Sequence, residues 1–452
     1  QWKIKENSLA LAQGLQNRDL KLAYGGTDSH FCMLDLNGVK TDTGFPLRGE
    51  PAVRILDMAG IVANKNTIPG DDITALAMGI RLGTPWLTQR GFGPAEMDEV
   101  ARLIHKTVTH VRPFSYIGLA GELPRGKIDL DIFEGIKHEV ATLAAKGIAE
   151  TADRGREYPH YYHLPGSTSP ADATLKPDDT PGLESELETA VFRALIFDLS
   201  QHGLLLVTGD RATPALQQIL TCDVEDLDEP YRSRQGFVLD REGIIMDDVS
   251  LLRLKSAGSG RDRYLMLTNP QNHERIKAWL RAVGDGYTLF DKLDLFAKVE
   301  GPLLVEDMAQ VEPERRLRVI GLRGSKSAQY REEAGLKGEL AILRSSKEIY
   351  FLVPPRPDQD VWDRLVAAGA VPGSQRAWDA LRAEVGLPNY HWESDRPSGL
   401  ELYNAGHQAR FELRKPYFVG CHNLDPVRAP LELAAFQWEE AEDPPLQRTP
   451  LY

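Results

Sequence analysis

Two adjacent carboxylates, Asp247 and Asp248, are the residues best suited to chemistry in the second half of the chain. They end the run GIIMDD, which starts at Gly243, and lead into the strand-like stretch VSLLRL. Neighbouring side chains of an extended chain point to opposite faces, so one carboxylate can face a cleft while the other caps a turn. A carboxylate in a cleft can bind and orient a nitrogen-rich ring or a cationic amine. The structural alternative is a turn that ends in a strand, where local hydrogen bonds favour aspartate.

Arg81 is the main candidate in the first half of the chain. Glycines flank it in GIRLGT, and three further segments of similar character are GGTDSH, NKNTIPGD and TQRGF. Glycine lets the backbone approach another group closely, and arginine can grip a carboxylate through two parallel hydrogen bonds. The pattern predicts a carboxylate site at Arg81. An arginine in a turn, paired with an acid at the surface, is the alternative.

Composition and charge exclude several classes of protein. The 452 residues carry a formal net charge of −13, which argues against broad binding to nucleic acid or anionic membranes. No apolar run approaches the roughly 18 residues of a membrane span. Cys32, Cys222 and Cys421 form no CxxC pair, which favours a reducing cytoplasm. His160 and His163 are the only close histidine pair, and a metal site usually needs three or four ligands, so we predict no metal.

A proline-rich stretch at 164–184 divides the chain, and it has almost no large apolar side chains, so it is typical of a linker. Before it, apolar spacing predicts a helix that starts after Asn7 and Ser8, a second over 94–110 and a third around 132–143. The segments KLAY and FCMLDL predict strands joined by a glycine-rich turn.

The second half is richer in predicted strands. They are LIFDLS, GLLLVTG, VSLLRL, YLMLTN, RLRVIGL, ELAILR and EIYFLV. Helices are predicted over 214–220, 273–283 and 360–368. Strands and helices are mixed without regular βα alternation, so the predicted fold class is α+β.

Three motifs of the first half occur in the order GGTDSH, NKNTIPGD and GIRLGTPWLTQRGF. In this order they resemble the C-terminal domain of serine hydroxymethyltransferase over about residues 1–112, which is a small α/β domain of a fold-type I pyridoxal phosphate enzyme. That family moves a one-carbon unit between serine and tetrahydrofolate, generally as a dimer. The resemblance implies that Arg81 holds the amino-acid carboxylate and that Asn66 faces the folate.

The resemblance lacks the upstream domain that carries the family's Schiff-base lysine. The sequence HKT around Lys106 echoes the family's lysine motif by chance, because it lies inside a predicted amphipathic helix. We therefore expect pyridoxal phosphate to bind only with an upstream domain, and we expect no hydroxymethyl transfer by this chain alone. Residues 113–163 are expected to add a helical extension.

The motifs FDLSQHGLLLVTGD, TCDV, GIIMDD, YLMLTNPQN, AWDALRAEVGLPNY and RKPYFVG also follow in order. They resemble the aminomethyltransferase (T-protein) of the glycine cleavage system over about 185–424, an α+β folate-binding domain. That family binds tetrahydrofolate and accepts an aminomethyl group from a lipoyl carrier protein. The resemblance implies that Asp248 grips the pterin and that Asn269 belongs to the same site.

Several positions depart from that family. Trp378 replaces an arginine that pairs with the acidic tail of folate, Gln235 replaces a tyrosine, and a loop is shortened around Ser345–Glu348. The tail at 425–452 ends in QRTPLY, which resembles the opening of a further aminomethyltransferase, so the chain is expected to be a slice of a fused polypeptide. Two functions stay open: a folate-dependent one-carbon transferase, or a non-catalytic scaffold that links two such enzymes.

Overall fold

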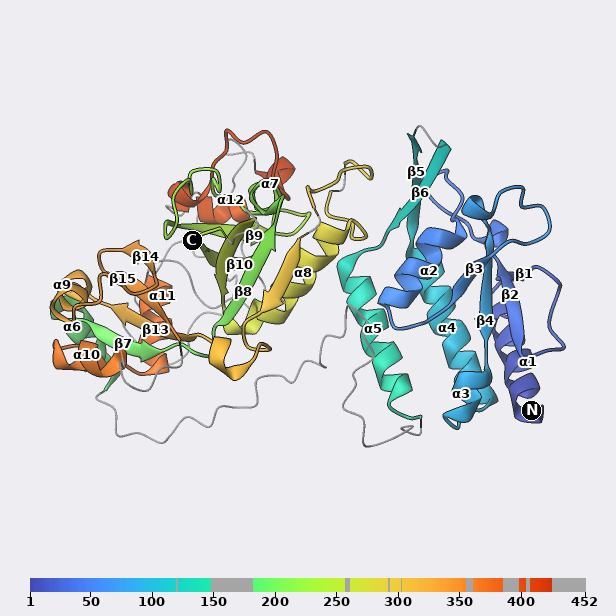
Figure 1. The fold of residues 1–452 in the computed structure, drawn as a ribbon, viewed down its shortest axis with the longest axis horizontal. Coiled ribbons are helices and arrows are strands. Elements are labelled where there is room, and N and C mark those ends of the chain that lie inside the picture. Colours follow the sequence, from blue (N-terminus) through green and yellow to red (C-terminus); the bar gives the residue numbers. More distant parts are fainter. Residues whose placement is uncertain are drawn as a thin grey trace, which may run out of the picture. The chain divides into compact units, whose positions relative to one another are not determined.

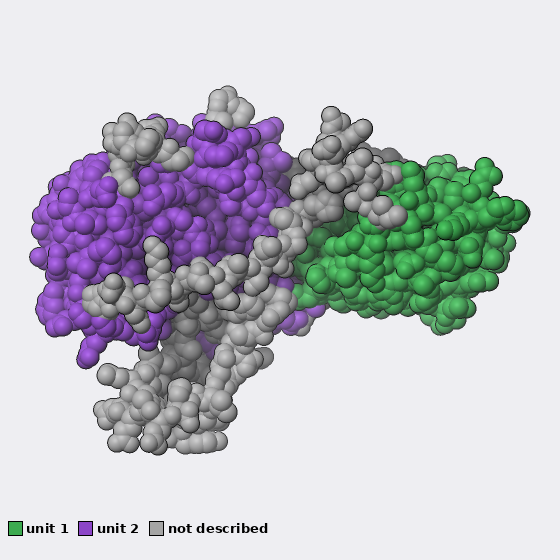
Figure 2. Space-filling view, turned by 90° about the horizontal axis from the view of Figure 1, so that it is seen from below, with its two compact units in different colours: residues 1–171, 286–289, 293–297 green, residues 172–285, 290–292, 298–452 purple. Residues whose placement is uncertain are grey.

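The chain divides into two compact units, which Figure 2 shows in different colours. Unit 1 comprises residues 1–171, 286–289 and 293–297, and unit 2 comprises residues 172–285, 290–292 and 298–452. The computed structural model describes residues 1–118, 121–147, 182–256, 261–291, 293–301, 303–354, 361–384, 398–403 and 407–424. Both units combine helices with largely antiparallel sheets, which confirms the predicted α+β class.

Unit 1 is a four-stranded antiparallel sheet with helices on its apolar face (Figure 1). Its elements are α1 (Trp2–Gln16), β1 (Lys21–Leu22), β2 (Phe31–Asp35), α2 (Gly49–Met58), β3 (Asn64–Asn66), β4 (Gly79–Gly83), α3 (Pro85–Gln89), α4 (Pro94–His110), β5 (Arg112–Gly118), β6 (Gly121–Lys127) and α5 (Leu130–Ala144). The strand order is β1-β2-β4-β3. Alternation along β4 sends Ile80 and Leu82 into the core with apolar residues of α1 and α4.

Two local predictions for unit 1 need correction. The first helix begins at Trp2, and Asn7 lies buried inside it, where its Nδ2 donates to Thr88 Oγ1 and to Phe92 O at 2.8 Å each. These long-range bonds satisfy the amide within the helix, so Asn7 is not a cap. The expected helical extension is helical only in α5, because β5 and β6 form a hairpin first. Residues 148–163 lie outside the described residues.

Unit 2 contains two five-stranded sheets. Its elements are α6 (Leu183–Phe192), β7 (Leu195–Asp198), β8 (Gly203–Gly209), α7 (Ala212–Ile219), β9 (Ser233–Leu239), β10 (Ile245–Arg253), β11 (Asp262–Thr268), α8 (His273–Asp285), β12 (Leu304–Asp307), β13 (Arg318–Arg323), α9 (Ser327–Glu333), β14 (Ala341–Ser345), β15 (Glu348–Val353), α10 (Val361–Ala367), β16 (Val371–Pro372), α11 (Gln375–Glu384) and α12 (Gly399–Leu402). All seven strands predicted for this half are present, as are the three helices.

The two sheets of unit 2 share one apolar core. The first sheet has the order β12-β8-β11-β10-β9, and the second has the order β14-β15-β13-β7-β16. One core cluster contains Leu252 and Leu265 from the first sheet together with Phe197 and Tyr350 from the second. Because strands alternate their side chains, polar residues of β10 and β14 are brought together where these two strands contact each other.

No described helix is long and apolar enough to cross a membrane. Within the predicted linker at 164–184, only 182–184 are described, and α6 already begins at Leu183. The tail at 425–452 lies outside the described residues, as do His160 and His163.

Candidate functional site

The two aspartates lie within strand β10 and not in a turn. Asp247 is 0% exposed and Asp248 is 1% exposed. The pairing of β10 with β9 shifts register between Ile245 and Asp247, which marks a β-bulge. A bulge re-aims the side chains that follow it, and both carboxylates reach the same asparagine from this position. The expectation of a turn with local hydrogen bonds was therefore wrong, because the partners come from distant segments.

Within the described residues, the carboxyl group of Asp247 accepts hydrogen bonds only from amide groups. Its Oδ2 accepts the backbone N–H of Asn269 at 2.9 Å, and its Oδ1 accepts Nδ2 of Asn269 at 2.7 Å and Nδ2 of Asn272 at 3.0 Å. Burial, and then the negative charge of Asp248, raise the pKa of Asp247. Asp247 thus fastens the segment between β11 and α8, and its neutral form is favoured relative to an ordinary aspartate.

Asp248 is an ion-pair residue. Its Oδ1 accepts Nη2 of Arg382 at 2.6 Å and Nδ2 of Asn269 at 2.7 Å, and its Oδ2 lies 3.3 Å from Nη2 of Arg344. Burial opposes the charged form, but Arg382, Arg344 and Arg410 together hold the pKa of Asp248 well below its usual range. The carboxylate is therefore ionised, and its charge is already neutralised by the protein.

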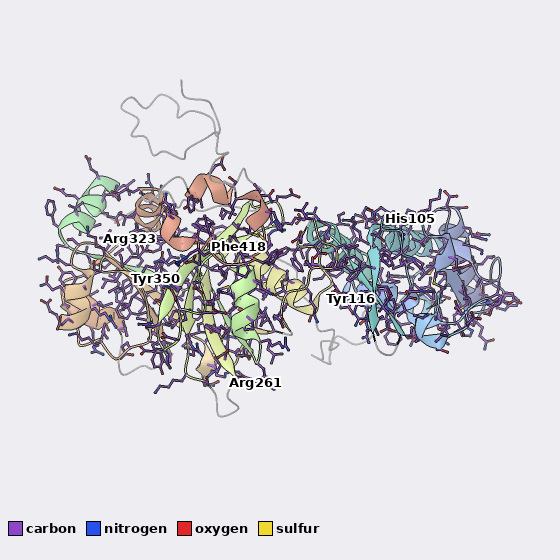
Figure 3. The ribbon with its side chains drawn as sticks, turned by 90° about the horizontal axis from the view of Figure 1, so that it is seen from above. His105, Tyr116, Arg261, Arg323, Tyr350 and Phe418 are labelled. Atoms are coloured by element: carbon purple, nitrogen blue, oxygen red, sulfur yellow. The ribbon has the colours of Figure 1, made fainter. Side chains whose placement is uncertain are left out.

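A second acid, Glu348, joins the same network. Its Oε1 accepts the hydroxyl of Tyr350 at 2.7 Å and lies 3.3 Å from Nη1 of Arg344, while its Oε2 lies 3.6 Å from Nη1 of Arg323. Figure 3 labels Arg323 and Tyr350, which approach this acid from β13 and β15. Nε of Arg344 also donates to Ser250 Oγ at 2.8 Å. We refer to Arg323, Arg344, Arg382 and Arg410 with Asp247, Asp248 and Glu348 as the arginine cluster.

Trp378, which the sequence singled out as a departure, fills the core beside this cluster. The indole is 1% exposed, and its ring centroid lies 5.1 Å from Phe197, 5.8 Å from Tyr350 and 6.1 Å from His202. The guanidinium of Arg323 lies 5.8 Å from the same ring. An indole carries no positive charge, so Trp378 cannot replace the ion pair that an arginine would form with an acidic ligand.

The other two departures stabilise the same region. Nε2 of Gln235 donates to the backbone carbonyl of Arg344 at 3.1 Å, which ties β9 to β14. The shortened loop leaves a tight connection between β14 and β15, so that Arg344 and Glu348 stand at its two ends and face each other at 3.3 Å. The first change joins the two sheets, and the second places an ion pair at the connection between two strands of one sheet.

The sequence interpretation missed Arg382, Arg344, Arg323, Arg410 and Glu348. Arg382 follows Trp378 by four residues on α11, so helical spacing could have placed both on one face. Arg344 gives no comparable local signal, since it meets Asp248 only because β14 of one sheet lies against β10 of the other.

Arg81 and Asn66 lie on one face of the unit 1 sheet. Arg81 stands opposite Asn64 across the β3–β4 pair, and Asn66 is two residues further along β3, so alternation places all three on the same side. Ile80 and Leu82 occupy the other side, in the core. Arg81 is exposed, and its guanidinium has no hydrogen bond or ion pair with any described residue. The surface ion pair considered for Arg81 in the sequence is therefore not formed within the described part of unit 1.

Two lysines of unit 1, Lys106 and Lys65, do not fit a Schiff-base role. Nζ of Lys106 pairs with Glu139 at 2.6 Å on the surface of α4, and Nζ of Lys65 pairs with Glu50 at 2.7 Å. A Schiff-base lysine must present its amine to a carbonyl group, whereas these two amines are held by carboxylates. We derive no step through pyridoxal phosphate on these residues.

Three potential metal ligands converge in unit 2, but a lysine occupies their centre. His273, Glu274 and Asp307 bring ligand atoms within 4.8 Å of one another. Nζ of Lys277, whose side chain is 0% exposed, lies 2.6 Å from Glu274 Oε1 and 2.7 Å from Asp307 Oδ2. The ammonium supplies the positive charge that a metal ion would bring, so the geometry is that of an internal ion pair.

The chain is an α+β protein with two units. Unit 1 carries Arg81 and Asn66 on one face of its sheet, and unit 2 carries the arginine cluster where its two sheets meet. Residues 1–104 match the family model of serine hydroxymethyltransferase, and residues 140–317 match that of the GCVT N-terminal domain. The chain therefore carries a serine hydroxymethyltransferase-type region followed by an aminomethyltransferase-type region, which confirms both resemblances.

Two relatives of the chain are serine hydroxymethyltransferases. The chain is 41% identical to serine hydroxymethyltransferase from Cutibacterium acnes over 143 residues, which are 31% of this chain and 27% of the relative. It is 46% identical to the enzyme from Salinispora tropica over 112 residues, which are 25% of this chain and 22% of the relative. The chain thus spans about a quarter of the length of these relatives.

One solved structure resembles a larger part of the chain. It is aminomethyltransferase T of the glycine cleavage system from Bartonella henselae, at 20% identity and a TM-score of 0.40. The similarity covers 54% of this chain and 65% of that one.

Proposed function

We propose that this chain is part of a folate-dependent one-carbon transferase that acts on glycine or serine. The order of the two matched regions supports the proposal. The observation that carries it is the exposed, unpaired guanidinium of Arg81, which stands on the same sheet face as Asn66. Such an arginine can bind the carboxylate of an amino acid through two hydrogen bonds, and Asn66 can offer an amide to a folate.

The experiment is calorimetric titration of the full chain with tetrahydrofolate, and separately with glycine or serine. Glycine binding should be lost in Arg81→Gln, and folate binding should weaken in Asn66→Ala. Arg54→Gln is a matched control, because Arg54 is an exposed arginine of the same unit that pairs with Glu50 at 3.1 Å. Equal affinities in wild type, Arg81→Gln and the control would refute the role of Arg81.

A second function, a non-catalytic scaffold, is favoured for unit 2 by the surroundings of Asp248. A pterin that bound this carboxylate would have to displace Arg382 at 2.6 Å and Arg344 at 3.3 Å from a side chain that is fully buried. As arranged, Asp248 and Asn269 do not fit the folate role that the resemblance implies, and we derive no step through folate on them. A scaffold would raise the local concentration of an intermediate shared by two linked enzymes.

Measured aminomethyl transfer decides between the two functions. The assay supplies an aminomethylated lipoyl carrier protein and tetrahydrofolate to the full chain and follows ammonia release. We expect no release above the rate without protein, and release that disappears in Asp248→Asn would refute the scaffold. Three further proposals rest on the sequence interpretation: a lipoyl carrier protein as partner, a homodimer and a cytoplasmic location. The three cysteines of the chain are free thiols.

A further inference from the structure

The arginine cluster carries more positive than negative charge. Within the described part of unit 2 it contains four guanidinium groups, from Arg323, Arg344, Arg382 and Arg410, and three carboxyl groups. The side chains of Arg323, Arg344 and Arg382 are 9%, 5% and 2% exposed. Removing a charge from water is costly unless an opposite charge compensates it. Asp248 and Glu348 pair with three of the arginines, whereas Asp247 bonds to amides, so the fourth arginine has no ion-pair partner among the described residues.

Among the described residues, Arg410 is the arginine of the cluster that forms no ion pair with an acid. Its guanidinium lies 5.5 Å from the ring of Phe237, which is the residue opposite Asp248 across the β9–β10 pair. Its Nη1 is buried and has no hydrogen-bond partner among the described residues. Burial and the neighbouring charge of Arg344 lower the pKa of Arg410 to about 10, which reflects a cation in an unfavourable position.

Two further buried donors in the same region lack an acceptor within the described residues. They are Nε of Arg382 and Nε1 of Trp378, and both residues are buried. Buried N–H groups nearly always have an acceptor, so three unsatisfied donors beside one cluster need an explanation. An anion with several acceptor oxygens would both neutralise the excess positive charge and accept hydrogen bonds from the unsatisfied donors.

We propose that the arginine cluster of unit 2 binds a compact oxyanion, a carboxylate or phosphate group, with Arg410 as its main ligand. The anion supplies the missing negative charge and accepts hydrogen bonds from donors that the protein leaves unpaired. Arginine is well suited to this role because its planar fork binds carboxylate and phosphate with two bonds. The inference does not depend on folate binding, since it requires Asp248 to stay paired with Arg382 and Arg344.

The test is titration calorimetry of the full chain with inorganic phosphate and with succinate, each against sodium chloride at matched ionic strength. The two ligands distinguish a phosphate source from a carboxylate source. We expect saturable binding of at least one, weakened at least about tenfold in Arg410→Gln, because a hydrogen bond to a charged group is lost. Arg410→Lys keeps the charge and should bind with intermediate affinity.

Arg414→Gln is the matched control, since Arg414 lies in the same segment with a side chain that is 90% exposed and pairs with Glu412. It should bind the anion like wild type. In parallel, the bound anion should raise the Tm of wild type and of the control, but not of Arg410→Gln. If neither phosphate nor succinate binds wild type more tightly than chloride does, the cluster is neutralised by the chain itself and the proposal is wrong.

Discussion

Arginine has opposite roles in the two units. In unit 1, Arg81 stands exposed on a sheet face between glycines and has no partner among the described residues. In unit 2, Arg344 and Arg382 are buried and share the carboxylate of Asp248. An exposed, unpaired arginine can take up a ligand carboxylate without breaking an existing pair. A buried pair instead fixes how two sheets pack, because removal of one partner leaves the other charged and unsolvated.

The difference also concerns how far each resemblance reaches. In each region the resemblance assigned two residues to a ligand site, namely Arg81 with Asn66 and Asp248 with Asn269. In unit 1 the pair faces outward, and in unit 2 it is enclosed by protein groups. Matching residue types therefore do not establish matching roles. The availability of hydrogen-bonding atoms decides whether an inherited residue can still act on a ligand.

Among the variants proposed here, Asp248→Asn should have the largest effect on the free energy of unfolding. The substitution keeps the shape of the side chain but leaves the buried Arg382 without a counter-charge and Arg344 with Glu348 alone, so the unfolding free energy should fall by about 3–5 kcal/mol. The measurement is urea unfolding of the full chain, followed by tryptophan fluorescence. Asp228→Asn is the control, because Asp228 pairs with Arg232 at 2.8 Å at an exposed position and should cost less than about 1 kcal/mol. Equal losses in the two variants would contradict the ion-pair role.

Asn269→Ala should have the next largest effect. Nδ2 of Asn269 donates to both aspartates at 2.7 Å, so its removal leaves two buried carboxyl groups with fewer donors and should cost about 1–3 kcal/mol. Asn423→Ala is a suitable control, since the amide of Asn423 makes an exposed bond to Arg241 O at 3.1 Å. Urea unfolding would show the difference. A stability within 0.5 kcal/mol of wild type, on the order of the effect of a surface change, would exclude a bridging role.

Acid should weaken unit 2 through Asp307. Burial opposes its charged form, but hydrogen bonds from His273 and Lys277 hold the pKa of Asp307 below its ordinary value. Its stabilising effect is complete above the unfolded pKa of about 4 and is lost as pH falls toward the folded pKa, with a slope of up to about 1.4 kcal/mol per pH unit. In urea unfolding from pH 5 to 2, Asp307→Asn should therefore lose stability less steeply than wild type. Parallel pH profiles would contradict the assignment.

Arg81→Gln should have the smallest effect on stability. An exposed side chain without partners contributes little, so the unfolding free energy should stay within about 0.5 kcal/mol of wild type. Arg344→Gln is the matched comparison from the buried set and should be clearly destabilising, because Asp248 and Glu348 lose a shared partner. If Arg81→Gln were as destabilising as Arg344→Gln, the contrast between the units would fail.

Most helices and strands, and the candidate site residues, could be predicted from the amino-acid sequence alone. Short apolar runs gave strands such as GLLLVTG and EIYFLV, and helical spacing gave 94–110 and 273–283, because these patterns depend on near neighbours in the chain. Arg81 and Asn66 were assigned by their motifs, and the sheet register then placed them on one face. The hairpin of β5 and β6 was missed, because Arg112–Lys127 lacks a clear apolar alternation.

The ion-pair partners of Asp248 could be identified only from the three-dimensional structure. Its partners Arg344 and Arg382 lie 96 and 134 residues away, on a strand and a helix that reach β10 through packing of the two sheets. No local pattern encodes such a meeting, since it depends on which strands lie against each other. The same packing buries Trp378 and leaves Arg410 without an acidic partner among the described residues. A carboxylate assigned to ligand binding by its motif is therefore an internal counter-ion, because burial and charge neutralisation are properties of the assembled core.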